Sequence, residues 1–191
     1  SSRLTFSSQG PRERPIVMIH GWAGGPEIWD PLLKQRAVQT LFPSFRHVTS
    51  PEEFVPRVLE RLPDEPVWVY AWSLGAMLAI EAALARPQFV RGLILFGGTG
   101  KFVDADRKLG WPERAMHRMQ ERMRHNRQAV VLGFRKQMFA PGEEAALARW
   151  NEAVPLDDAA EFSIPALNAG LEYLLQTDLT DRLPQLACPV V

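Results

Sequence analysis

The chain has 191 residues, with 22 basic and 22 acidic side chains, 46% hydrophobic residues and 23% charged residues. This composition is typical of a folded globular domain and excludes a disordered chain. No apolar run reaches the roughly 18 residues of a membrane helix, and the single cysteine, Cys188, excludes an internal disulfide. We therefore expect a cytoplasmic enzyme or binding domain with no membrane partner.

The charge is unevenly distributed along the chain. Residues 101–136 carry 10 basic and 4 acidic side chains, a net charge of +6, whereas residues 137–191 carry 2 basic and 9 acidic ones, a net charge of −7. A segment this basic could bind an acidic partner, or it could be a solvated helix face that pairs with the acidic segment. The interleaved aromatic residues of a nucleic-acid surface are missing, so we expect no nucleic-acid partner.

Short apolar runs alternate with helical patterns in residues 1–100. Three runs bounded by glycine or proline are typical of strands buried in a parallel sheet, namely residues 16–19, 67–70 and 93–96. A further short strand is predicted over 45–49. Helices are predicted over 27–39, 52–62 and 74–86, and Pro56 weakens the second of them. This alternation predicts a three-layer α/β fold with a mostly parallel sheet.

The pattern changes at Lys101. Helices are predicted over 112–131, 143–153 and 165–176, and the last residues, 186–191, return to a strand-like apolar run. In the first of these helices Met116, Met119 and Met123 share one face, which we expect to point inward while most arginines point outward. A helical block between two strands is typical of a lid. We divide the chain into a core at 1–100, a helical lid at 101–180 and a return to the sheet at 181–191.

The sharpest chemical signal is Ser73, in the stretch Ala71-Trp72-Ser73-Leu74-Gly75 between a predicted strand and a predicted helix. Small residues two positions before and after the serine allow strand and helix backbones to converge. The pattern is that of a nucleophile elbow, G-x-S-x-G, with Ala71 in place of the first glycine. The alternative is a structural crossover that packs strand on helix.

A second signal is the glycine-rich stretch from His20 to Gly25, directly after the first predicted strand. An acyl-transfer site needs two N–H donors for the oxyanion, one after the nucleophile and one from such a loop. Leu74 and Trp22 are the candidate donors. His20 opens this loop, and we expect it to shape the loop rather than to act as the base.

Other motifs do not support a function. His47, His117 and His125 are expected to be structural or solvated. Residues 97–101 lack the first glycine and the final Ser or Thr of a phosphate loop. No Cys or His spacing suits a metal, so we expect neither a metal nor another cofactor.

With these residues in place, the chain resembles the α/β-hydrolase family. The matching stretches are Val17–Gly25 (VMIHGWAGG), Trp68–Leu78 (WVYAWSLGAML), Arg86–Gly97 (RPQFVRGLILFG) and Asn168–Val191. The resemblance implies Ser73 as nucleophile, Trp22 and Leu74 as oxyanion donors, and contact of the acyl chain with Trp22 and with the stretch that holds Phe134 and Met138. It also implies a catalytic Asp and His beyond Val191. We therefore expect a C-terminally truncated chain that is inactive as it stands and a monomer when full length.

Within this family the chain is most similar to carboxylesterases that cleave methyl esters of acyl chains on acyl carrier protein, in biotin synthesis. Docking of the acidic carrier would suit a basic helix surface formed by Arg114, Arg118, Arg122, Arg124 and Arg127. Two alternatives stay open. One is a generic small-ester hydrolase or thioesterase, and the other is a hydrolase-like binding protein without turnover.

Overall fold

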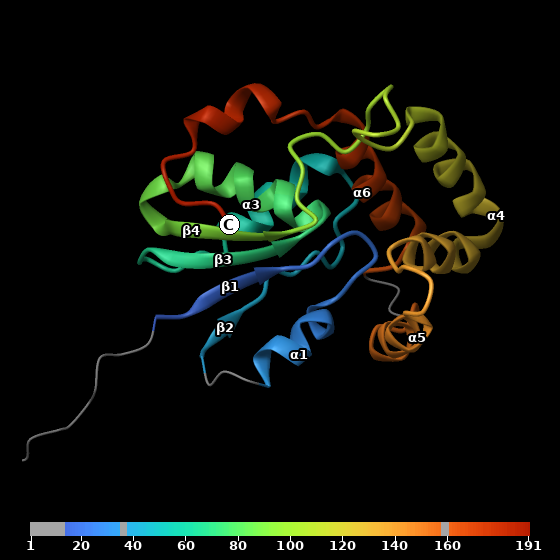
Figure 1. Ribbon diagram of the computed structural model, residues 1–191, viewed down its shortest axis with the longest axis horizontal. Helices are drawn as coiled ribbons and strands as arrows, with labels where there is room; N and C mark the ends of the chain where they lie inside the picture. The colour runs from blue at the N-terminus through green and yellow to red at the C-terminus, as the bar shows by residue number, and fades with distance from the viewer. Residues whose placement is uncertain (1–13, 35–37, 158–160) are drawn as a thin grey trace, which may run out of the picture.

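The computed structural model describes residues 14–34, 38–157 and 161–191. A parallel four-stranded sheet in the order β2-β1-β3-β4 forms its centre (Figure 1). The strands are β1 (Ile16–Ile19), β2 (Thr40–Leu41), β3 (Val67–Trp72) and β4 (Val90–Phe96). Val17, Val69 and Leu93 pair side by side across β1, β3 and β4 and are fully buried, because both faces of the sheet are covered. The predicted α/β fold and its three apolar strands are confirmed.

The strand predicted over 45–49 is wrong. These residues form a turn in which His47 has a φ of 62°, a backbone conformation that cannot continue a strand ladder. The second strand is β2 instead, earlier in the chain, where Ile16 and Val17 of β1 pair with Thr40 and Leu41. Phe45 and Val48 are buried, so the apolar pattern reports core packing rather than sheet pairing.

The end of the chain returns to the sheet, as the sequence predicts. Val190 bridges Leu93 of β4 in the parallel sense. The Leu93 N–H donates to the Pro189 carbonyl oxygen, and the Val191 N–H donates to the Leu93 carbonyl oxygen, each at 2.9 Å. Residues between β4 and this pairing therefore form an excursion from one sheet.

Helix α3 (Leu74–Ala85) packs against β1, β3 and β4, and α2 (Phe54–Leu59), preceded by the 3-10 turn η2 (Pro51–Glu53), packs against α3. Pro56 is the third residue of α2, in the first turn, where its missing N–H costs no helical hydrogen bond. The helix predicted over 27–39 is shorter: it consists of η1 (Pro26–Trp29) and α1 (Asp30–Leu33), and residues 35–37 lie outside the described residues.

Glu81 is the single charged residue of α3, and it links this helix to the end of the chain. Its carboxylate accepts a hydrogen bond of 2.5 Å from the Tyr173 hydroxyl and lies 3.8 Å from the Arg182 guanidinium. Burial and the Glu81 charge raise the pKa of Tyr173, so its hydroxyl stays protonated and donates. The contact fixes the second half of the chain on α3.

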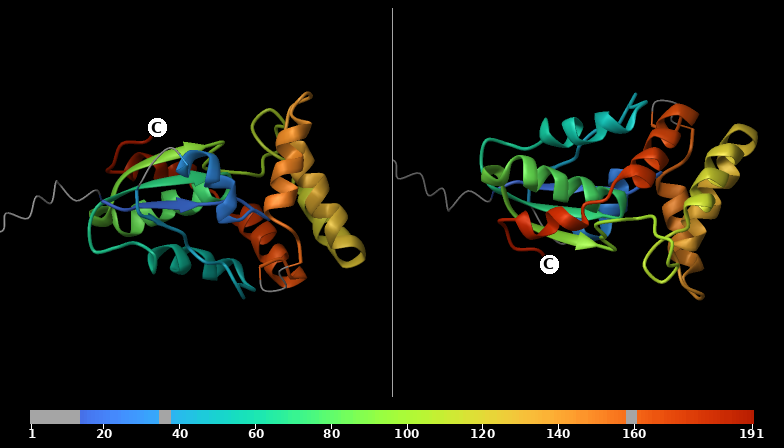
Figure 2. Two further views of the ribbon diagram at one scale, coloured as in Figure 1. Left: turned by 90° about the horizontal axis from the view of Figure 1, so that it is seen from below. Right: turned by 90° about the horizontal axis from the view of Figure 1, so that it is seen from above.

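Three helices lie beyond the carboxyl ends of the strands, as Figures 1 and 2 show. They are α4 (Glu113–Gln137), α5 (Glu144–Ala153) and α6 (Ile164–Gln176), and the 3-10 helix η4 (Thr180–Gln185) follows them. Met116 and Met123 are fully buried on α4 and Met119 is partly buried, as predicted from their spacing. No helix among the described residues is long and apolar enough to cross a membrane.

Helix α4 is kinked at Asn126, which has non-helical angles of φ −155° and ψ 82°. The Asn126 side-chain oxygen accepts the Ala129 N–H at 3.0 Å, which caps the second half of the helix. The kink turns the second half back toward the sheet (Figure 1). Phe134 and Arg135 of this half are consequently buried against the loop that follows β1.

Candidate active site

Ser73 occupies a sharp turn between β3 and α3. Its φ of 55° and ψ of −117° form a conformation that residues other than glycine rarely adopt. The turn is held on both sides, because the Ser73 N–H donates to the Phe96 carbonyl oxygen at 3.1 Å and the Ser73 carbonyl oxygen accepts the Ala76 N–H at 2.9 Å. Within the described residues the Ser73 hydroxyl has no hydrogen-bond partner. This is the backbone geometry of a nucleophile elbow.

The small residues around Ser73 are required by close backbone approach. A Cβ on Gly75 would lie 2.5 Å from the carbonyl oxygen of Ile19 and 2.6 Å from that of His20. A Cβ on Gly21 would lie 2.7 Å from the ring of Trp72 and 3.1 Å from the Ser73 Cβ. The loop after β1 therefore lies directly against the turn that holds Ser73.

Two N–H groups flank this contact. Leu74 is the first residue of α3, and the first N–H groups of a helix have no intrahelical partner. The Gly24 N–H donates to the Gly21 carbonyl oxygen at 3.1 Å and closes a turn around Trp22 and Ala23. In the part of the chain that the structure describes, the Trp22 N–H makes no hydrogen bond. The arrangement can supply the two donors that a developing oxyanion needs.

The Trp22 side chain extends from this turn into the helices beyond the sheet. Its indole N–H donates to the Leu167 carbonyl oxygen of α6 at 2.9 Å. Its ring meets Phe134 of α4 edge-on, with centroids 4.9 Å apart. Gly170 of α6 gives it room, because a Cβ there would lie 2.5 Å from the indole. The structure thus brings Trp22 and Phe134 together.

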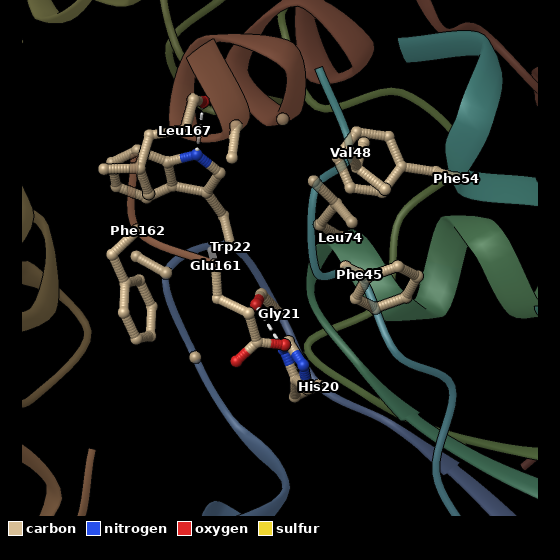
Figure 3. A pocket seen from close by; sticks show the side chains of 14 residues that line it. His20, Gly21, Trp22, Phe45, Val48, Phe54, Leu74, Glu161, Phe162 and Leu167 are labelled. Atoms are coloured by element: carbon tan, nitrogen blue, oxygen red, sulfur yellow. Dashed lines mark hydrogen bonds between the residues drawn. The ribbon is translucent and has the colours of Figure 1, made fainter. Parts of the chain in front are cut away.

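A small cavity of about 40 Å³ lies beside Trp22. Figure 3 shows its walls: His20, Gly21 and Trp22 from the loop after β1, Leu74 from α3, and Leu167 from α6. Phe45, Val48, Phe54 and Phe162 add apolar surface, and Glu161 contributes a carboxylate. The cavity is therefore apolar with a few polar groups, the usual lining of a small-molecule site.

His20 is positioned as a loop residue rather than as a base. It is 7% exposed, and its Nδ1 lies 2.9 Å from the Gly21 carbonyl oxygen. Burial lowers the pKa of His20, so its ring is neutral at pH 7 and Nδ1 donates that hydrogen bond. His117 and His125 lie exposed on α4, where His117 contacts Glu113 at 3.3 Å. Among the described residues, no histidine forms a hydrogen bond with Ser73.

Met138 lies apart from Trp22 and Phe134. It lines a groove between α1, α4 and α5 together with Trp72 and Trp150, whose rings meet edge-on at 5.2 Å. Met138, which directly follows α4, therefore lines a different cavity from Phe134, which packs on Trp22.

Four of the five arginines expected on the surface of α4 are exposed: Arg114, Arg118, Arg122 and Arg124. The prediction for Arg127 is wrong. Arg127 is half-buried, and its guanidinium donates to the carbonyl oxygens of Leu156 and Phe162. It follows the kink at Asn126, which rotates it away from the face of the first half of α4.

Sequence reasoning missed Arg135 and Glu161. Arg135 is fully buried, although the stretch 134–138 reads as basic and amphipathic. Its place four residues after buried Val131 and one after Phe134 was the available signal, since helical spacing assigns it to the apolar face. Glu161 shows no periodicity that would assign it to a cavity. The described residues include no group of three or more His, Cys, Asp or Glu side chains that could hold a metal.

The chain is similar to known proteins in sequence and in fold. A family model described as "Alpha/beta hydrolase family" matches residues 16–191. Pimeloyl-[acyl-carrier protein] methyl ester esterase of Edwardsiella ictaluri is 30% identical over 98% of this chain and 76% of its own length, and that of Serratia marcescens is 30% identical over 98% and 77%.

Solved structures show the same fold. A hydrolase from Oleispira antarctica superimposes with a TM-score of 0.71 at 13% identity and covers 95% of this chain and 72% of its own. A carboxylesterase structure from Nitrososphaera gargenis gives a TM-score of 0.69 at 17% identity, with 94% and 71% covered. With the family model spanning the whole sheet and the helices beyond it, this chain belongs to the alpha/beta hydrolase family.

Proposed function

We propose that this protein is a serine carboxylesterase that cleaves the methyl ester of an acyl chain carried by acyl carrier protein, in biotin synthesis. One observation carries the catalytic part of the proposal. Ser73 combines a strained backbone with a hydroxyl that forms no hydrogen bond to a described residue. Beside it lie the N–H groups of Trp22 and Leu74, which likewise have no partner among the described residues. The substrate part is supported by the relatives, which are named for a methyl ester on an acyl carrier protein.

In this reaction the Ser73 Oγ attacks the ester carbonyl carbon while a general base takes the hydroxyl proton. The carbonyl oxygen becomes an oxyanion that accepts hydrogen bonds from the Trp22 and Leu74 N–H groups, each contributing about 3 kcal/mol in the transition state. Collapse of the tetrahedral species breaks the bond to the methoxy oxygen, which takes up the proton and leaves as methanol. Water then hydrolyses the acyl-serine by the same steps.

The base is not assigned to any of the four histidines. A base must lie within hydrogen-bond reach of the serine hydroxyl, and no described histidine forms a hydrogen bond with Ser73. His20 is held by the Gly21 carbonyl oxygen, and burial keeps it neutral. Its role in the proposal is to shape the loop that carries the Trp22 N–H.

The helices of residues 101–180 act as a lid in this proposal. A groove of about 230 Å³ runs between the two halves of kinked α4, with Trp111, Met119 and Phe134 as apolar walls and Arg118 and Arg122 at its edge. Phe134 also packs on Trp22, so the groove adjoins the loop beside Ser73. The apolar walls of the groove can pack against an acyl chain, and the arginines at its edge can bind an anionic group of the carrier-linked substrate. The exposed arginines of α4 can attract the acidic carrier protein.

The test compares the protein as its gene encodes it with Ser73→Ala, on a carrier-linked methyl ester and on a free methyl ester of the same acid. We expect Ser73→Ala to lower the turnover rate about 10⁶-fold while the protein still folds. We also expect the carrier-linked ester to be preferred at low salt and less so at high salt. Equal preference at every salt concentration would indicate a generic esterase. Carrier binding without turnover would indicate a binding protein.

A further inference from the structure

Arg135 is a buried cation that has no carboxylate partner among the described residues. It is 0% exposed, and none of the described acidic side chains forms an ion pair with it. Its guanidinium donates instead to backbone and amide oxygens: Nη2 to the Ala23 carbonyl oxygen at 2.7 Å, and Nη1 to the Val154 carbonyl oxygen at 2.9 Å and to Asn151 Oδ1 at 3.2 Å. The guanidinium also lies 5.0 Å from the centre of the Trp150 ring.

Burial of this charge lowers the stability of the folded protein. A buried charge loses its hydration, and an apolar side chain of similar size would fill the space without that loss. Burial lowers the pKa of Arg135 to about 10, so the side chain is still charged at pH 7. Its Nε has no partner within the described residues. Core packing therefore does not explain why an arginine, rather than an apolar residue, lies at this position.

The oxygen that Arg135 engages lies in the loop beside Ser73. Ala23 follows Trp22 in the turn that the Gly24 N–H closes on the Gly21 carbonyl oxygen, and its φ is 53°. In such a turn, a positive φ at the third residue favours glycine, so alanine here is strained. The bond from Arg135 fixes the carbonyl of this strained residue and with it the turn that orients the Trp22 N–H.

The same loop has a second anchor in the helices beyond the sheet. Trp22 is held by Leu167 of α6 and by Phe134, the neighbour of Arg135 on α4. We infer that Arg135 is a positioning residue, which couples the seating of α4 and α5 to the orientation of the Trp22 N–H as an oxyanion donor. This inference rests on the proposed esterase function and adds a residue outside the loop that controls its geometry.

Arg127 provides a matched control. It lies on the same helix and also donates to two backbone carbonyl oxygens, those of Leu156 and Phe162, but neither belongs to the loop beside Ser73. Arg135→Met and Arg127→Met each remove one guanidinium bridge from α4 to backbone carbonyl oxygens. Arg135→Lys keeps the charge, but its single ammonium group lacks the two separate nitrogens with which the guanidinium binds the Ala23 and Val154 oxygens. It serves as the milder variant if Arg135→Met does not fold.

The experiment measures kcat, KM and the affinity for a boronic acid transition-state analogue in the gene-encoded protein. We expect Arg135→Met, or Arg135→Lys, to lower kcat and analogue affinity about 100-fold in parallel, with KM changed less than about threefold. Arg127→Met should lower the melting temperature with kcat changed less than about twofold. Equal losses of kcat in both variants, or a loss confined to melting temperature, would overturn the inference.

Hydrogen exchange separates this inference from the proposed function. The amides of residues 21–25 should exchange faster in Arg135→Met than in Arg127→Met, whether or not the protein hydrolyses esters. Absence of turnover in the wild type would contradict the proposed function but not a faster exchange in this loop. Unchanged exchange at residues 21–25 would contradict the positioning role even in an active esterase.

Discussion

Gly75 lies so close to His20 that a Cβ on Gly75 would stand 2.6 Å from the His20 carbonyl oxygen. The start of α3 and the end of β1 therefore meet backbone to backbone, with no side chain between them. This contact sets the distance between the Leu74 N–H at the helix start and the loop that carries Trp22. The geometry of the candidate oxyanion hole thus depends on a missing Cβ.

Gly75→Ala should disrupt this contact. The new methyl group would lie 2.5 Å from the Ile19 carbonyl oxygen, a distance that forces one backbone to shift. We expect a destabilisation of about 1–3 kcal/mol and a loss of turnover that exceeds it, because the shift separates the two N–H donors. Thermal unfolding and ester turnover, measured together, test both effects.

Gly133→Ala is the matched control for that substitution. Gly133 lies in α4 and a Cβ there would meet no heavy atom within 4 Å. Alanine should stabilise the helix by about 0.5–1 kcal/mol. Because Gly133 lines the groove along α4 and not the loop beside Ser73, turnover of a free methyl ester of a short acid should stay unchanged. A Gly75→Ala variant that behaved like Gly133→Ala would show that the contact is not needed.

The exposed arginines of α4 give a second prediction. Arg118→Glu with Arg122→Glu should slow turnover of a carrier-linked ester about tenfold at low salt and spare a small free ester, because long-range attraction to an acidic partner is lost. The difference should shrink at high salt. Arg86→Glu with Arg91→Glu changes the net charge equally on exposed residues at the end of α3 and in β4. If this control pair slowed the carrier-linked ester as much, the proposed docking surface would be wrong.

The parts of this molecule that the sequence predicts are those with local signals. Strands β1 and β3 are continuous apolar runs, β4 contains one at residues 93–96, and the turn at Ser73 needs small residues at fixed neighbouring positions. Contacts between distant segments have no such signal. Arg135 and Ala23 are 112 positions apart, so a basic residue on an amphipathic helix gave no hint of its buried partner. The kink at Asn126, which rotates Arg127 inward, likewise depends on how α4 packs.

The turn before α2 gives a pH-dependent prediction. Glu53 Oε2 accepts hydrogen bonds from the N–H groups of Thr49 and Ser50, at 3.0 and 2.8 Å, and from the Ser50 hydroxyl at 2.9 Å. These bonds lower the pKa of Glu53 below its ordinary value of 4.5. The stabilisation is therefore complete above the unfolded pKa and disappears as the pH falls through the lower folded pKa.

Glu53→Gln should consequently lower the melting temperature at pH 7, with a difference from the wild type that vanishes under acid conditions. Glu52→Gln is the control, since the Glu52 carboxylate makes no hydrogen bond within the described residues. Melting curves of the three proteins between about pH 7 and pH 3 measure the effect. A difference that stayed constant over this range would exclude a role for the ionised carboxylate.

Gly170 makes room for Trp22, and its replacement sets two effects of opposite sign against each other. Alanine in the interior of α6 gains about 1 kcal/mol of helix propensity. Its Cβ, however, would lie 2.5 Å from the Trp22 Cδ1 and 2.9 Å from its Nε1. The indole cannot move away freely, because Phe134 meets its ring and the Leu167 carbonyl oxygen binds its N–H.

Overpacking of this kind costs about 1–3 kcal/mol, so we expect a net loss of stability in Gly170→Ala. Displacement of Trp22 should also lower kcat on a free methyl ester of a short acid, whereas Gly133→Ala, with the same change on α4, should not. A stabilised and fully active Gly170→Ala variant would show that Trp22 is free to move and that its position does not control the site.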